Sequence, residues 1–166
     1  MKKTITRLLL ILLLLAAMPA LLSCKSSPDS PAENTVTFTD ALGRQVSVPA
    51  EPQRTAALIG SFADVWVLSG GSLCAAPEET WLDYQLNLPD AVNIGGAHSP
   101  SLELLLSADP QFVIASASTA SNVDMLEVLE AAGITVAYFD VDHFEDYLNM
   151  LKKYSNISRM VQMRTY

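Results

Sequence analysis

Short apolar runs alternate with helix-like stretches along most of the chain, and this alternation constrains the fold more than any other feature. The runs lie at 55–59, 73–76, 112–115 and 134–139. They have the length and composition of strands buried on both faces of a parallel sheet. Amphipathic patterns typical of helices separate these runs. The predicted helices end at Gly70-Gly71, Asp109-Pro110 and Gly133. The order predicts an α/β fold, with parallel strands joined by right-handed crossovers and flanked by helices.

Turn and cap residues predict the ends of these elements. A β-hairpin is predicted at 35–48, with its turn at 40–43, and a brief strand at 93–94. Helices are predicted at 62–69, from 100 to 108, from 121 to 132 and at 143–157, with residues 77–93 as a loop. The expected N-cap residues are Ser61, Ser99 and Ser121.

The first 34 residues have the pattern of a targeting signal followed by a tether. Lys2, Lys3 and Arg7 precede an apolar stretch at 8–22, which is short for a membrane span. Its end, Leu21-Leu22-Ser23-Cys24, resembles the bacterial lipobox, in which the cysteine thiol is lipidated. We therefore expect a lipoprotein signal at 1–23, lipidation at Cys24 and a flexible tether at 24–34. An ordinary secretory signal with a chance cysteine is the alternative.

The charge balance excludes one class of partner and constrains another. The 166 residues carry 10 Lys+Arg against 18 Asp+Glu, a formal net charge of −8, which argues against binding to nucleic acid. Residues 55–151 contain no Lys or Arg but 14 Asp+Glu. Because this stretch offers no cationic side chain to an anionic ligand, it favours neutral or weakly charged ligands. Two cysteines are too few for a disulfide scaffold, and Cys74 is expected to be a buried, inert thiol.

Ligands of parallel α/β sheets bind at the carboxyl ends of the strands, where the loops at 60–62, 96–98 and 116–120 are expected. A single histidine in such a loop does not make a metal site. An aromatic side chain in the 77–93 loop either stacks on a flat ligand or covers a hydrophobic patch, whereas Trp66 is expected in the core. No convergent set of nucleophile, acid and base is present, so neither an enzyme nor a cofactor is predicted. The candidate ligand-binding residues are Ser61, Phe62, Trp81, His98 and Ser118.

Several segments together resemble one known family. The stretch from Asp40 to Pro49 is similar to the opening hairpin of the Fe/B12-type periplasmic binding proteins, which are substrate-binding components of ABC importers for ferric siderophores, haem and cobalamin. The resemblance covers residues 35–157. Its other segments are 54–59, 93–96, 100–105, 109–116, 131–136 and 144–147.

The resemblance implies an N-terminal α/β lobe at 35–142 and the start of an inter-lobe helix at 143–157. The ligand would lie between two lobes. Glu103 matches the glutamate that docks on basic residues of the permease. Residues 158–166 depart from the family pattern, and we expect them to mark a truncated or frameshifted product. The helix stripe of Tyr147, Leu151 and Tyr154 is then expected to be partly uncovered.

The resulting hypothesis is a lipid-anchored, extracytoplasmic substrate-binding protein of an ABC importer, with a permease as partner and an iron-siderophore, haem or cobalamin-like ligand. The alternative is a one-lobed adaptor, anchored at the cell surface, that binds a protein partner.

Overall fold

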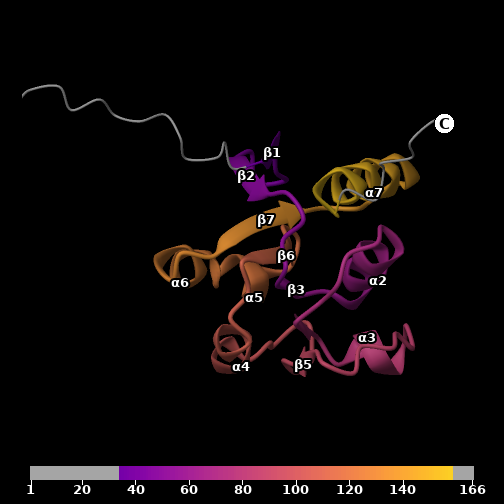
Figure 1. Ribbon diagram of the computed structural model, residues 1–166, viewed down its shortest axis with the longest axis vertical. Helices are drawn as coiled ribbons and strands as arrows, with labels where there is room; N and C mark the ends of the chain where they lie inside the picture. The colour runs from indigo at the N-terminus through magenta and orange to yellow at the C-terminus, as the bar shows by residue number, and fades with distance from the viewer. Residues whose placement is uncertain (1–33, 159–166) are drawn as a thin grey trace, which may run out of the picture. The chain divides into compact units, whose positions relative to one another are not determined.

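A five-stranded parallel sheet with helices on both faces forms the body of the molecule (Figure 1). The computed structural model describes residues 34–158. The strand order is β5-β4-β3-β6-β7, and a separate antiparallel hairpin, β1-β2, precedes the sheet in sequence. The α/β lobe predicted from the alternation of apolar runs and helical stretches is confirmed.

The elements have the following bounds. The hairpin comprises β1 (Thr35–Thr39) and β2 (Gln45–Pro49). The sheet comprises β3 (Thr55–Ala57), β4 (Ala75–Ala76), β5 (Val92–Asn93), β6 (Phe112–Ser116) and β7 (Thr135–Phe139). The helices are α2 (Gly60–Leu68), α3 (Glu79–Leu82), α4 (Leu102–Ser107), α5 (Ala120–Val123), α6 (Leu126–Ala131) and α7 (Phe144–Ser158).

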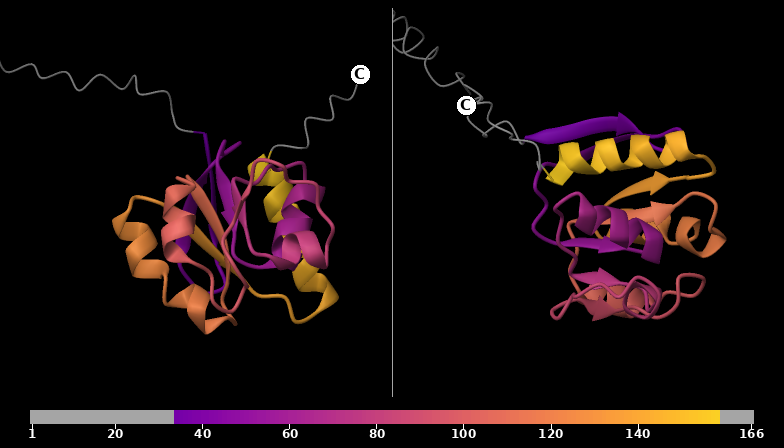
Figure 2. Two further views of the ribbon diagram at one scale, coloured as in Figure 1. Left: turned by 90° about the horizontal axis from the view of Figure 1, so that it is seen from below. Right: turned by 90° about the vertical axis from the view of Figure 1, so that its right-hand side faces the viewer.

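The central strands are apolar because both of their faces are covered. All residues of β3 and β6 are buried. Helices α2, α3 and α7 lie on one side of the sheet, and α4, α5 and α6 lie on the other (Figure 2). One core forms around Trp66 and Phe139, and the second forms around Leu105, Leu129 and Tyr138. Trp66 is a core residue, as predicted, with 1% of its surface exposed.

The hairpin is attached to β7 by backbone and side-chain hydrogen bonds that are organised around one buried carboxylate; the Ala41 N–H, for example, donates to the Tyr138 carbonyl oxygen at 2.9 Å. The side chain of Asp40 accepts hydrogen bonds from the backbone N–H groups of Leu42 (3.0 Å) and Arg44 (2.9 Å), and from the Arg44 guanidinium at 2.7 Å. It also accepts a bond from the backbone N–H of Tyr138 in β7, at 3.4 Å. The hairpin therefore covers the outer edge of β7, which would otherwise offer unpaired backbone groups to another chain.

Helix α7 packs closely on the lobe. Met150, Tyr154 and Ile157 are buried, and the Tyr154 ring meets Trp66 and Phe139 edge to face, with centroid separations of 5.5 and 4.9 Å. The stripe of Tyr147, Leu151 and Tyr154 was expected to be partly uncovered: Tyr154 is buried, contrary to that expectation, whereas Tyr147 and Leu151 are half-buried. The exposed apolar side chains of α7 are Phe144 and Leu148, one turn apart at its N-terminal end.

Several local predictions were also wrong. Ser101, rather than Ser99, caps α4, accepting a hydrogen bond from the Leu104 N–H at 3.3 Å. Helix α2 begins after Ile59 without a side-chain cap, so Ser61 lies inside the helix. The single helix predicted over 121–132 is divided at Asp124–Met125 into α5 and α6, and Ser121 lies within α5. Cys74 is partly rather than fully buried, and burial raises its pKa, which favours the less reactive thiol form.

Two buried tyrosines provide a matched test of the packing. The Tyr154 hydroxyl is buried without a hydrogen-bond partner among the described residues, whereas the Tyr138 hydroxyl donates to the Asn122 carbonyl oxygen at 2.8 Å. We expect Tyr154→Phe to raise the free energy of unfolding by about 1 kcal/mol, because it removes a buried hydroxyl that has no partner. Tyr138→Phe should lower it by a similar amount, about 1 kcal/mol, because the carbonyl loses its donor. Urea unfolding of the two variants measures both changes.

The same pair predicts the response to alkaline pH. Burial raises the pKa of Tyr138 to about 12 and that of Tyr154 well above its usual value. An unfolded tyrosine loses its proton near pH 10, so both groups bind their protons more tightly in the folded state. Stability should therefore fall as the pH rises above about 10. The fall should be shallower in Tyr154→Phe, and an unchanged slope would contradict the assignment.

Candidate ligand-binding edge

The loops that follow the sheet strands meet at the carboxyl edge of the sheet, which is the usual ligand position in this class of fold. After β3 the chain enters α2 through Leu58 and Ile59, and after β4 it enters α3 through Pro77 and Glu78. The loop at 94–101 follows β5, and the loop at 117–119 follows β6. The predicted ligand edge therefore draws on four separate strands.

Helix α3, which sequence analysis missed, packs against the start of α2. A Cβ atom placed on Gly60 would lie 3.0 Å from Cε2 of Tyr84 and 3.1 Å from Cβ of Glu79. Only glycine leaves room for this approach without displacement of a neighbour. Tyr84 is itself 39% exposed, so it lies over Gly60 with part of its ring open to solvent.

The ligand residues predicted from the sequence differ in how far their side chains are exposed to solvent. His98 and Ser118 are exposed in the loops after β5 and β6, and Ser61 is partly buried in the first turn of α2. Trp81 is partly buried in α3 and packs against the Trp66 core. Phe62 is 6% exposed and meets Phe139 edge to face at 6.4 Å, so the structure places it in the core rather than on the edge.

Asn122 connects two loops of this edge, and sequence analysis missed it. It is fully buried, accepts a hydrogen bond from the Ser116 N–H at 3.1 Å and donates to the Ala97 carbonyl oxygen at 3.4 Å. Ser116 in turn lies 2.9 Å from Ser118, hydroxyl to hydroxyl. The available signal was a side-chain amide inside a predicted helix, a position that Asn disfavours unless it bonds to backbone.

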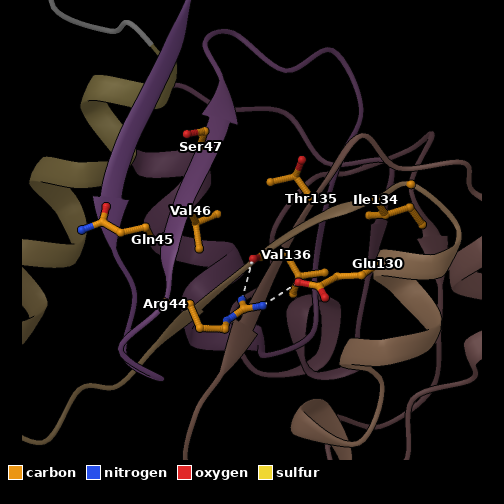
Figure 3. Close-up of a pocket in the computed structure, with 9 residues that line it drawn as sticks. Arg44, Gln45, Val46, Ser47, Glu130, Ile134, Thr135 and Val136 are labelled. Atoms are coloured by element: carbon orange, nitrogen blue, oxygen red, sulfur yellow. Dashed lines mark hydrogen bonds and ion pairs between the residues drawn. The ribbon is translucent and has the colours of Figure 1, made fainter.

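A cavity of about 330 Å³ lies away from this edge, between β2, α6 and β7 (Figure 3). Arg44 is its one lining cation. Its guanidinium donates to Glu130 at 2.7 Å and to the Val136 carbonyl oxygen at 2.9 Å, in addition to its bonds to Asp40. Because these protein groups already engage the cation, the cavity holds no free positive charge for an anionic ligand. The candidate site is placed at the carboxyl edge because that edge is the usual ligand position in parallel α/β sheets.

Two further properties of residues 34–158 bear on function. Within this range no group of three or more His, Cys, Asp or Glu side chains is arranged to hold a metal ion. The same range contains no helix with the length and apolar character needed to cross a bilayer. Glu103 is exposed in the first turn of α4. Cys24, the predicted lipidation site, lies outside the described residues.

Solved structures of binding proteins share this fold. Staphylococcus aureus SirA complexed with staphyloferrin B is 20% identical, with a TM-score of 0.58, over 76% of this chain and 44% of SirA. The petrobactin-binding protein YclQ from Bacillus subtilis is 15% identical, with a TM-score of 0.63, over 76% of this chain and 46% of YclQ. The haem-binding protein HmuT is 18% identical, with a TM-score of 0.59, over 76% of this chain and 42% of HmuT.

The chain has the fold of one lobe of these binding proteins. It spans less than half the length of each of the three. No protein-family model and no curated protein matches the sequence. The fold that the resemblance implied is confirmed, and the three solved structures named above are those of siderophore- and haem-binding proteins.

Proposed function

We propose that this chain is the substrate-binding lobe of an ABC importer for an iron-siderophore or haem. The observation that carries the proposal is the agreement in fold with proteins that bind staphyloferrin B, petrobactin and haem, over three quarters of the chain. A fold alone does not fix a function. The carboxyl edge of the sheet supports the proposal because hydroxyl, imidazole and aromatic groups come together there from α2, from α3 and from the loops after β5 and β6.

The ligand would lie over the first turn of α2, which carries Ser61, and over the loops that carry His98 and Ser118, with Trp81 in α3 to the side. These groups recognise a chelate by hydrogen bonding and shape rather than by charge. Cobalamin, which the sequence resemblance also suggested, belongs to the same class of bulky metal chelates and is retained as a second ligand to test.

The importer partner follows from the same proposal. Glu103 is exposed, and it would meet a basic residue of the permease without touching the ligand. A charge at the rim of an interface mainly steers association. Cys24 would carry a lipid with two acyl chains, and this lipid would hold the protein on the outer side of the cell membrane. Two acyl chains anchor a protein far more firmly than one does.

The proposal predicts where a ferric chelate touches the lobe. We expect the Fe(III) complexes of staphyloferrin B or petrobactin, or haem, to broaden the amide NMR signals of the loops at 58–61, 94–101 and 117–119 first, because the paramagnetic iron would be nearest to them. One lobe supplies only part of the contacts, so we expect a Kd no tighter than about 100 μM. The measurement uses the full chain in detergent micelles.

The matched control is the same chelate with Ga(III), which binds alike but does not broaden signals. The proposal fails if none of the ferric chelates broadens any loop at millimolar concentration. It also fails if the broadening centres on the cavity around Arg44 and Glu130. Absence of all chelate binding by a stably folded monomer would favour the adaptor hypothesis.

The anchor has its own test. Cys24→Ala should abolish incorporation of labelled palmitate and prevent normal processing, because the thiol is the atom that receives the lipid. Cys74→Ala is the matched control and should change neither. Membrane retention of Cys24→Ala equal to that of the unmodified chain would rule out the lipid anchor.

A further inference from the structure

The backbone of Ala97 is held at its N–H and at its carbonyl oxygen by side chains of two different helices. The Ala97 N–H donates to Oε1 of Glu79 in α3 at 3.0 Å. The Ala97 carbonyl oxygen accepts from Nδ2 of Asn122 in α5 at 3.4 Å. Ala97 precedes His98, so the loop that carries this candidate ligand residue is fixed by groups that lie far from it in sequence.

Asn122 extends the connection to the next loop. Its Oδ1 accepts from the Ser116 N–H at 3.1 Å, and its own carbonyl oxygen accepts from the Tyr138 hydroxyl at 2.8 Å. Ser116 contacts Ser118 through the two hydroxyls. The loops after β5 and β6 are therefore joined through one buried amide.

Glu79 closes the connection on the α3 side. The backbone N–H of the preceding residue, Glu78, donates to the Gly95 carbonyl oxygen at 2.9 Å. The start of α3 therefore contacts the same loop at two points. The second carboxylate oxygen of Glu79, Oε2, is buried and has no hydrogen-bond partner among residues 34–158. Burying a carboxylate oxygen without a partner costs free energy. Glu79 is therefore a poor choice for stability alone, and its distinctive contact is with the Ala97 N–H.

We propose that Glu79 and Asn122 are positioning residues that hold the Ala97 loop and the Ser116–Ser118 loop as one preformed surface for the ligand. The inference rests on the proposed function for the identity of that ligand. A preformed surface avoids the entropy cost of ordering loops on binding. Residues behind a binding surface commonly fix the side chains that touch the ligand in this way.

Amide hydrogen exchange of the full chain, in the same micelles, tests the inference without a ligand. In Glu79→Ala the Ala97 amide should exchange at least about tenfold faster, because it loses a charge-assisted hydrogen bond. Glu79→Gln keeps an acceptor oxygen for Ala97 and should restore protection. The Phe112 amide, which donates to the Arg54 carbonyl oxygen at the opposite end of the sheet strands, reports global stability and should be unchanged in both variants.

Glu78→Ala is the matched control. It removes an exposed neighbouring carboxylate, keeps the main-chain bond to Gly95 and should leave Ala97 protected. Unchanged exchange at Ala97 in Glu79→Ala would overturn the inference, and so would an equal loss of protection at Ala97 and Phe112, which marks a purely structural role. Failure of every ferric chelate to bind the unmodified chain would instead contradict the proposed function, because the exchange result does not depend on a ligand.

Discussion

The buried carboxylate of Asp40 is the interaction on which the rest of the lobe depends. None of its side chain is exposed, and a carboxylate removed from water is tolerated only when its lone pairs are occupied. Asp40 meets this requirement with the turn N–H groups, the Arg44 guanidinium and the Tyr138 N–H. One group thus closes the hairpin turn and joins it to β7. The Arg44 guanidinium also lies over the Tyr138 ring, 5.2 Å from its centroid.

This attachment determines which surface of the sheet remains open. The hairpin covers the outer edge of β7, and α7 covers the adjoining face through Tyr154 and Ile157. Helices occupy both faces, so the loops at the carboxyl edge are where a ligand can approach the strand ends. The hydrogen bonds at Ala97 act at this edge. The attachment at Asp40 fixes the hairpin on β7, one edge strand of the sheet, and the bonds at Ala97 fix the loop after β5, the other edge strand. Each fixes a connection with buried polar groups.

Elements whose buried residues recur at a regular spacing could be predicted from the sequence. Features that depend on contacts between residues distant in the sequence could not. The β6 run and the α7 stripe were predictable because their apolar residues follow the spacing of a strand and of a helix. Helix α3 was not, because four residues give no period and its position depends on contact between Tyr84 and Gly60. Phe62 was predicted at the ligand edge from its place after a strand, but its direction is set by Phe139, which lies 77 positions away. The partners of Asn122 were unpredictable for the same reason.

Charge places a final constraint on what the edge can recognise. Residues 34–158 include four Lys or Arg, and three of them have defined partners in the protein. Arg44 binds Asp40 and Glu130, Arg54 donates to the carbonyl oxygens of Ala108 and Asp109 at the end of α4, and Lys153 lies over the ring of Phe38. The fourth, Lys152, is in α7. Arg44 and Arg54 therefore stabilise connections rather than bind anions. If the proposed ligand binds at this edge, backbone N–H groups, hydroxyls and aromatic rings would recognise it. The strength of such contacts depends more on fixed geometry than the strength of an ion pair does. This dependence is the physical argument for rigid support of the edge loops by groups such as Glu79 and Asn122.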